Sequence, residues 1–182
     1  MVTKDRTSVL DLYSVPENGK AEIINGELVQ MSPTGGLPGR ASLRLSSSLQ
    51  RHEEEFGGGY AIPDNVGFVV NLPHRRSFSP DAAWFTGDVV DMDFLIGAPA
   101  FAIEVRSKND YGTVAEGEIR QKIADYFAAG TQVVWDVDLL GEYSVRVYRA
   151  DGPDEPTIHR RGEIADAEPA VPGWRFAIDG LF

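Results

Sequence analysis

The amino-acid sequence predicts an α/β (α+β) fold: a mixed β-sheet flanked by helices, with an N-terminal β-hairpin. The first observation is Asn25-Gly26 between two β-rich runs, which is the strongest short-range signal for a hairpin. The second is a strand-like apolar run, a helix-periodic segment and another apolar run in succession after residue 99. Helices placed between strands in this way are typical of a domain built on a mixed sheet, and we expect residues 1–182 to form one such domain.

In the first half of the chain, turn residues mark the boundaries of the predicted elements. Residues 8–14 have room for one or two helical turns, and residues 21–31 form the predicted hairpin. The apolar residues of 40–55 recur at approximately helical spacing, and the Gly57-Gly58-Gly59 run is a typical end for a helix. Two short β-rich runs follow as predicted strands, at 60–63 and 67–72.

The second half contains the predicted centre of the sheet. Residues 81–85 and 100–105 are apolar runs that predict strands, and the second shows little alternation, as a central strand covered on both faces does. Apolar residues at three- to four-residue steps predict a helix over 114–129, which Gly130 ends. Further strands are expected after this helix: a buried one at 132–137, a half-exposed one at 143–148, and C-terminal edge strands.

Composition restricts the function. Hydrophobic residues make up 42% of the chain, enough for a folded core, while 17 Lys and Arg against 28 Asp and Glu give a net charge of −11. Such a surface repels phosphate backbones, which excludes a simple basic nucleic-acid binder and leaves contacts that are local or assisted by metal or a partner. The lack of cysteine excludes thiolate zinc sites and a thiol nucleophile. Because the sequence shows no secretory signal and no long apolar run, we expect a cytoplasmic protein that does not contact a membrane.

Two acids stand at the ends of predicted strands. Asp81 follows Pro80 at the start of one apolar run, and Glu104 lies near the end of the next. A charged Glu104 among apolar neighbours needs a cation, a hydrogen-bond network or solvent, because burying an unpaired charge costs several kcal/mol. Mg²⁺ held by one or two carboxylates meets that need. The alternative is that Asp81 caps a turn and that Glu104 pairs with Arg106 or another base.

The predicted helix adds a lysine. Lys122 follows the Glu104 strand and has Tyr126 four residues later, so its ammonium can reach back over the strand end toward a bound phosphate. A single lysine on a helix is more commonly solvated, and an aromatic residue at the Tyr126 spacing is more commonly part of the core. The three residues in this chain order are more specific than any one of them.

The residues resemble a known family. Pro80-Asp81, then Ile103-Glu104-Val105-Arg106-Ser107, then the segment from Lys122 to Gly130 and Val134 to Val137 are similar to the Uma-two type of restriction endonucleases, within the PD-(D/E)xK nuclease superfamily. The hairpin residues 22–29 and Met31-Ser32-Pro33 match the opening pattern of that family, so the resemblance covers roughly residues 10–148.

The resemblance implies a restriction-endonuclease-like fold and metal-dependent hydrolysis of phosphodiesters with Mg²⁺ or Mn²⁺. It makes Asp81, Glu104 and the Val105 backbone carbonyl the metal ligands. Lys122 stands in for the motif lysine, which in the general pattern lies where this chain has Arg106, and is expected to orient or deprotonate the nucleophile and to stabilise the phosphate. Glu27, Arg106 and Tyr126 are auxiliary candidates. Glu27 is expected at the edge of the site, with an exposed turn acid as its alternative.

The expected substrate is DNA, and the basic candidates for contacting it are few. The His74-Arg75-Arg76 loop is a compact basic cluster that either touches a nucleic-acid backbone or is merely exposed. Arg40 stands where many family members carry a histidine, which makes it an approximate substitute. A homodimer is expected from the exposed hairpin and from three apolar C-terminal residues, Trp174, Phe176 and Phe182, and a basic partner protein is a further expectation.

Two other function classes remain open from the sequence. The first is a binding or scaffold protein that has kept the fold and weakened the chemistry. The second is a magnesium-dependent phosphohydrolase that acts on a small phosphate ester, which a narrow closed pocket would favour over an open cleft.

Overall fold

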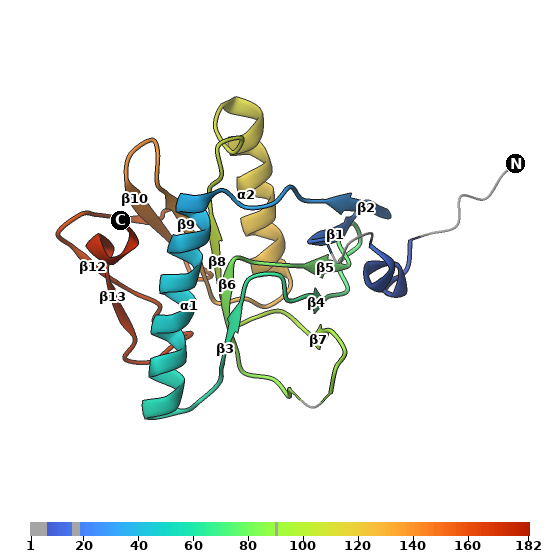
Figure 1. Ribbon diagram of the computed structural model, residues 1–182, viewed down its shortest axis with the longest axis horizontal. Coiled ribbons are helices and arrows are strands. Elements are labelled where there is room, and N and C mark those ends of the chain that lie inside the picture. Colours follow the sequence, from blue (N-terminus) through green and yellow to red (C-terminus); the bar gives the residue numbers. More distant parts are fainter. Residues whose placement is uncertain (1–6, 16–18, 90) are drawn as a thin grey trace, which may run out of the picture.

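The computed structural model describes residues 7–15, 19–89 and 91–182, and Figure 1 shows a central sheet between two long helices. Residues 1–6 lie outside the described residues. The expectation that the chain has no secretory signal falls partly on them. None of the helices in the described part of the chain is long and apolar enough to cross a bilayer.

The central sheet has six strands. In spatial order they are β11 (Thr157–Arg160), β10 (Ser144–Arg149), β9 (Val133–Asp138), β8 (Phe101–Val105), β6 (Ala82–Phe85) and β3 (Tyr60–Pro63). β8 and β9 pair in parallel and the other neighbours pair antiparallel, so the sheet is mixed, as predicted. β8 lies inside the sheet, which confirms that the run with little alternation is a central strand.

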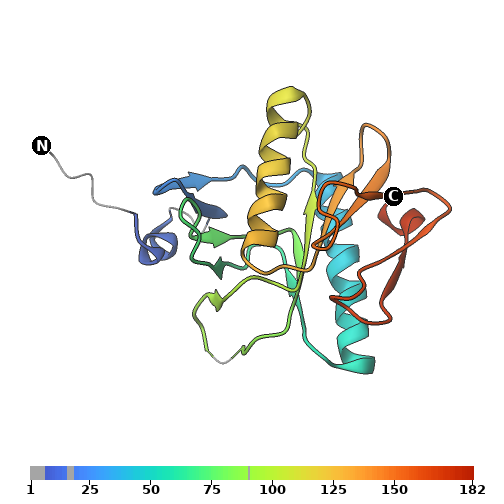
Figure 2. The ribbon, with the colours of Figure 1, turned by 180° about the vertical axis from the view of Figure 1, so that it is seen from behind.

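The two long helices cover opposite faces of the sheet, as the front and back views show (Figures 1 and 2). α1 (Gly36–Phe56) packs against one face with Leu45 and Leu49, and α2 (Thr113–Ala128) packs against the other with Ile123 and Tyr126. Side chains along β8 alternate between these two cores: Phe101, Ile103 and Val105 face α1, and Ala102 faces α2. Glu104 therefore projects toward α2.

α1 begins four residues before the predicted start at Arg40. Gly35, Gly36 and Pro38 have the composition of a loop, yet Gly35 is the N-cap and Pro38 lies in the first helical turn. A proline is tolerated there because the N–H groups of a first turn have no partner inside the helix. The helix ends at Phe56, where Gly57 adopts φ 66° and its N–H donates to the Glu53 carbonyl, so the glycine run ends the helix as predicted.

Short elements complete the fold. The hairpin pairs β1 (Ala21–Ile24) with β2 (Glu27–Gln30), and Asn25 and Gly26 both have positive φ, as a tight hairpin turn requires. The others are the 3₁₀-helices η1 (Val9–Ser14) and η3 (Ile178–Leu181), the three-stranded sheet of β5 (Ser77–Phe78), β4 (Phe68–Val69) and β7 (Leu95–Ile96), and the pair β12 (Ile164–Asp166) and β13 (Arg175–Ala177).

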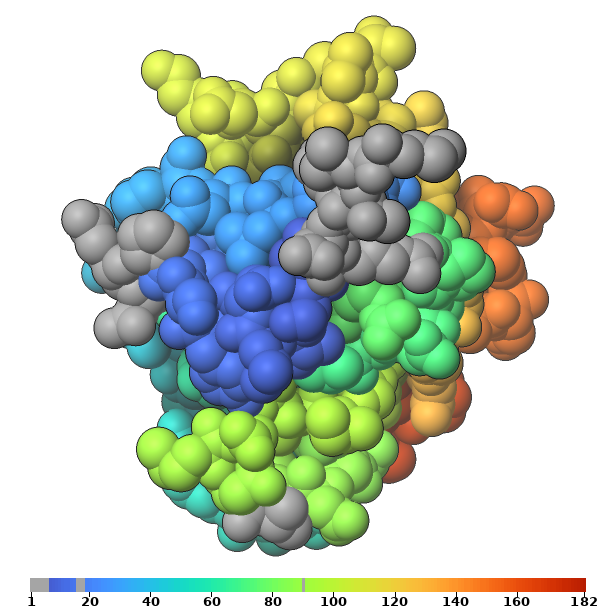
Figure 3. All heavy atoms as spheres, turned by 90° about the vertical axis from the view of Figure 1, so that its right-hand side faces the viewer, coloured from blue at the N-terminus to red at the C-terminus, as the bar shows by residue number. Residues whose placement is uncertain are grey.

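The hairpin end of the molecule is shown in Figure 3, where η1 lies beside the segment that leads into β7. Tyr13 stacks on Phe94 with ring centroids 4.1 Å apart and donates to Asp93 at 3.0 Å. At the other end, Trp174 and Phe176 belong to the α1 core, with only 3% and 8% of their surface exposed. The expectation that these two residues form a dimer surface is therefore wrong, because they pack inside the chain.

Candidate active site

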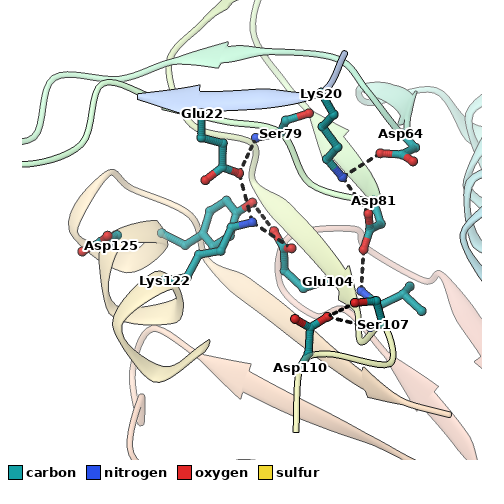
Figure 4. Close-up of polar contacts among 12 residues, drawn as sticks. Lys20, Glu22, Asp64, Ser79, Asp81, Glu104, Ser107, Asp110, Lys122 and Asp125 are labelled. Atoms are coloured by element: carbon teal, nitrogen blue, oxygen red, sulfur yellow. Dashed lines mark hydrogen bonds and ion pairs between the residues drawn. The ribbon is translucent and has the colours of Figure 1, made fainter. Parts of the chain in front are cut away.

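Asp81 and Glu104 lie on neighbouring strands at the same end of the sheet (Figure 4). β6 and β8 pair antiparallel with Ala82 opposite Ile103, which brings the residue before β6 next to Glu104. The Asp81 N–H donates to the Ile103 carbonyl at 3.0 Å, and Asp81 Oδ2 accepts the Val105 N–H at 2.7 Å. The sequence prediction that neighbouring strands bring the two acids together is confirmed.

Two side chains of α2 contact Glu104. Lys122 Nζ lies 2.9 Å from Glu104 Oε2, and the Tyr126 hydroxyl donates to Glu104 Oε1 at 2.6 Å. Lys122 and Tyr126 are four residues apart and therefore share one face of the helix. Tyr126 is fully buried and stacks on Phe78 with ring centroids 4.0 Å apart, so it belongs to the core and contacts the site at the same time.

The hairpin supplies a carboxylate that sequence reasoning missed. Glu22 of β1 is 1% exposed, and its Oε1 lies 3.0 Å from Lys122 Nζ and accepts the Ser79 N–H at 3.0 Å. Arg75 donates to its other oxygen. Glu22 shows the signal that singled out Glu104, an acid within a short apolar strand. Glu27, the hairpin acid expected at the site, is exposed at the start of β2.

A second lysine lies beside Asp81. Lys20, just before β1, places Nζ 2.7 Å from Asp81 Oδ1 and 2.7 Å from Oδ1 of Asp64, a residue of the turn after β3. Its side chain is 14% exposed. Neither Lys20 nor Asp64 carries a sequence signal, because a lysine before a strand and an aspartate in a turn are ordinary at such positions.

Burial and neighbouring charges shift the pKa values of the site. Burial raises the pKa of Glu104 above 4.5, Lys122 opposes this shift, and the charges of Asp81 and Glu22 raise the pKa further. For Lys122, burial lowers the pKa, but the attraction of Glu104 and Glu22 outweighs it and holds the pKa above 10.5. Lys122 is therefore an ammonium at neutral pH. It can stabilise an anionic oxygen, and its part in orienting or deprotonating the nucleophile stays a prediction.

Arg106 does not contribute to the acid pair. Its guanidinium donates to both carboxylate oxygens of Asp136, at 2.7 and 2.6 Å, and also to Glu116 at the start of α2. These contacts hold the side chain in a separate, buried ion-pair network. These contacts contradict the expectation of Arg106 as an auxiliary residue of the site. Glu104 pairs with Lys122 instead, so the alternative that Glu104 pairs with a base holds for Lys122 and not for Arg106.

The basic loop is only partly available to a ligand. Arg75 is 4% exposed and pairs with Glu22 and Asp125, so the prediction that it contacts nucleic acid is wrong. His74 is 42% exposed at its side chain, with Nε2 2.7 Å from Asp125 Oδ1. Arg76 and Arg40 are exposed, and their contact with nucleic acid stays a prediction.

The donor set fits a hard divalent cation. Among the described residues, no three His, Asp or Glu side chains are grouped as a metal site. Asp81, Glu104 and the Val105 carbonyl stay the predicted ligands. Magnesium is held by one or two carboxylates with water and phosphate oxygens, which matches such a sparse set. The Lys20 ammonium at Asp81 Oδ1 marks a place that attracts positive charge.

Comparisons with known proteins identify the fold and the family. A structural match is a protein from Anabaena variabilis ATCC 29413, described as "a putative nuclease belonging to DUF820", with a TM-score of 0.75 and 19% sequence identity over 97% of each chain. At that identity the match shows a shared fold. A comparison with curated proteins gives no match.

A family model covers nearly the whole chain. The model of the Uma2 family, described as "Putative restriction endonuclease", matches residues 7–179. This range extends the resemblance seen in the sequence to the C-terminal strands. By this match and by its mixed sheet with flanking helices, the chain belongs to the Uma2 family and has a restriction-endonuclease-like fold.

Proposed function

We propose that this protein is a nuclease that hydrolyses phosphodiester bonds of DNA with Mg²⁺ or Mn²⁺. The observation that carries the proposal is the meeting of Asp81 and Glu104, from adjacent strands, with the ammonium of Lys122. Two acids and a lysine at one sheet end are the groups that metal-dependent phosphodiester hydrolysis needs. Membership of the Uma2 family supports the same reaction class.

Asp81, Glu104 and the Val105 carbonyl would hold the ion. When bound, such an ion lowers the pKa of a water molecule and offsets the charge that develops on the phosphate. Asp81 is well placed for this role because the Val105 N–H fixes its Oδ2. Glu104 is held by the hydroxyl of Tyr126, so both carboxylates are oriented before a cation arrives.

Lys122 would bind the phosphate as a cation. Its ammonium is held between Glu104 and Glu22, and Glu22 is held in turn by the Ser79 N–H and Arg75. A charge positioned before the substrate arrives stabilises the transition state without a cost of reorganisation. Glu22 is therefore a positioning residue for Lys122.

The test is cleavage of labelled single- and double-stranded DNA in Mg²⁺ or Mn²⁺. We expect metal-dependent cleavage by the native chain and at least about a hundredfold loss for Asp81→Asn, Glu104→Gln and Lys122→Met. Glu54→Gln, an exposed acid near the far end of α1, serves as the matched control and should cleave like the native chain.

Equal activity in all variants would contradict the site. Mn²⁺ binding with no cleavage of any DNA would instead support the binding or scaffold function. Hydrolysis limited to small phosphate esters would support the phosphohydrolase.

A further inference from the structure

Lys20 occupies the side of Asp81 that a cation would approach. One oxygen of Asp81, Oδ2, accepts the Val105 N–H, which leaves Oδ1 available to a cation. Lys20 Nζ lies 2.7 Å from that Oδ1. The lysine is anchored by its own backbone, because the Lys20 carbonyl accepts the Met31 N–H at the end of the hairpin. A metal ion at Asp81 would therefore meet an ammonium already in place (Figure 4).

Asp64 offers the same ammonium a second acceptor. Its Oδ1 lies 2.7 Å from Lys20 Nζ and also accepts the Asn65 N–H at 2.7 Å, which fixes the carboxylate in its turn. Lys20 can therefore leave Asp81 and remain paired with Asp64. Its ammonium is then not left unpaired in a site where the side chain is only 14% exposed.

An ammonium and a divalent ion on one carboxylate oxygen repel each other strongly at such short range. We propose that Lys20 and Asp64 set the metal affinity of this site: Lys20 competes with the divalent ion for Asp81 Oδ1, and Asp64 holds the ammonium while the ion is bound. This inference rests on the proposed metal-dependent function. By this inference, Lys20 and Asp64 are positioning residues. Without metal, the ammonium groups of Lys20 and Lys122 offset the charges of Asp81 and Glu104.

The test measures Mn²⁺ affinity directly, from the electron paramagnetic resonance signal of free Mn²⁺ titrated with protein. Removing the competing charge in Lys20→Met should tighten binding by about tenfold or more relative to the native chain. Lys20→Arg keeps the charge and should stay within about threefold of the native chain. The matched control is Arg51→Met, which removes one positive charge from an exposed position on α1. Ser42 marks where α1 passes the site, because its hydroxyl donates to the Asp81 carbonyl, and Arg51 lies nine residues further along the helix. Arg51→Met should have no effect, because roughly 13 Å of helix exceeds the screening length in physiological salt.

A double-mutant cycle separates the role of Asp64 from that of a metal ligand. Asp64→Asn alone should weaken Mn²⁺ binding several-fold, because Lys20 then has only Asp81 to pair with. In the Lys20→Met background the same change should alter affinity by less than about threefold. A loss of tenfold or more in that background would mean that Asp64 binds the metal itself, and the assignment would be overturned.

Unchanged Mn²⁺ affinity in a folded Lys20→Met variant, with an unaltered melting temperature, would also overturn the inference. That result leaves the proposed function intact if the native chain still cleaves DNA. Failure of the proposed function looks different: the native chain would bind Mn²⁺ and cleave nothing. If neither the native chain nor Lys20→Met binds Mn²⁺, both the inference and the proposed metal site are wrong.

Discussion

Asp138 shows how one side chain shapes a loop on this fold. It ends β9 and accepts the N–H groups of Leu140, Gly141 and Glu142, together with the hydroxyl of Tyr111 at 2.8 Å. Gly141 permits this approach, since a Cβ there would lie 2.7 Å from Asp138 Oδ2. Burial raises the pKa of Asp138, but these donors outweigh burial and bring the pKa below 3.8.

This shift predicts a pH-dependent contribution to stability. Because the pKa is lower in the folded state, the stabilisation is fully present above pH 4 and is lost as the pH falls through the folded-state pKa. Asp138→Asn should lower the free energy of unfolding at pH 7 by on the order of 1 kcal/mol. The difference from the native chain should shrink below pH 3 in denaturant melts. Asp154→Asn, in an exposed turn, should match the native chain at both pH values.

The predicted site residues were those with a local pattern. Asp81, Glu104 and Lys122 fall on motifs in order along the chain, and the structure brings them together as expected. Glu22 carries the same signal as Glu104, an acid within a short apolar strand, but was not among the predicted residues. Lys20 and Asp64 could not be predicted, because they meet Asp81 only through the docking of the hairpin and a turn, which no local pattern records.

Among the elements, the hairpin depends on a buried arginine for its attachment to α2. Arg75 bridges Glu22 of β1 and Asp125 of α2, and its guanidinium lies 4.9 Å from the centre of the Phe78 ring. Both carboxylates are at most 2% exposed. Removing Arg75 would take a buried cationic partner from each acid and leave Glu22 with Lys122 and Asp125 with His74. Breaking such buried pairs is far more costly than losing a surface pair.

We therefore expect Arg75→Met to lower the free energy of unfolding by about 3–5 kcal/mol. The neighbouring Arg76→Met is the matched control, because Arg76 is exposed and surface substitutions usually change stability by no more than about 0.5 kcal/mol. Urea unfolding of the two variants measures the difference. Equal stability of both variants would show that the buried network does not hold the hairpin to the helix.

The elements that the sequence predicted well are the long ones. The two helices, the hairpin and the strands β3, β6, β8, β9 and β10 fall within a few residues of their predicted places, and β3 matches its predicted range. β5 and β7 were missed because each has two residues and exists through pairing with β4. The first turn of α1 was missed because Gly36 and Pro38 are loop formers that helix capping tolerates.

For the whole molecule, the net charge of −11 sets the conditions under which DNA can bind. Long-range repulsion opposes the duplex, and Arg40 and Arg76 are the exposed arginines among the predicted nucleic-acid contacts. We expect the Lys122→Met variant, which keeps both acids, to bind labelled duplex weakly in chelator at physiological salt. Mn²⁺ should raise its affinity at least tenfold in fluorescence anisotropy. Tight binding in chelator would contradict this expectation.

Assembly of the protein stays a prediction. Of the three C-terminal residues, Trp174 and Phe176 lie in the core, and Phe182 is partly buried against it. The remaining basis for a homodimer is mainly the hairpin end, where Leu10, Tyr13 and Val29 are exposed. A basic partner protein likewise stays an expectation that rests on the acidic surface alone.

The central claim is that Asp81 and Glu104 support metal-dependent cleavage of DNA. Its most direct measurement compares the native chain and Glu104→Gln on supercoiled plasmid, each in Mg²⁺ or Mn²⁺ and in chelator. The claim predicts nicked or linear product for the native chain with metal and none in the other conditions. Cleavage in chelator, or equal cleavage by Glu104→Gln, would contradict it.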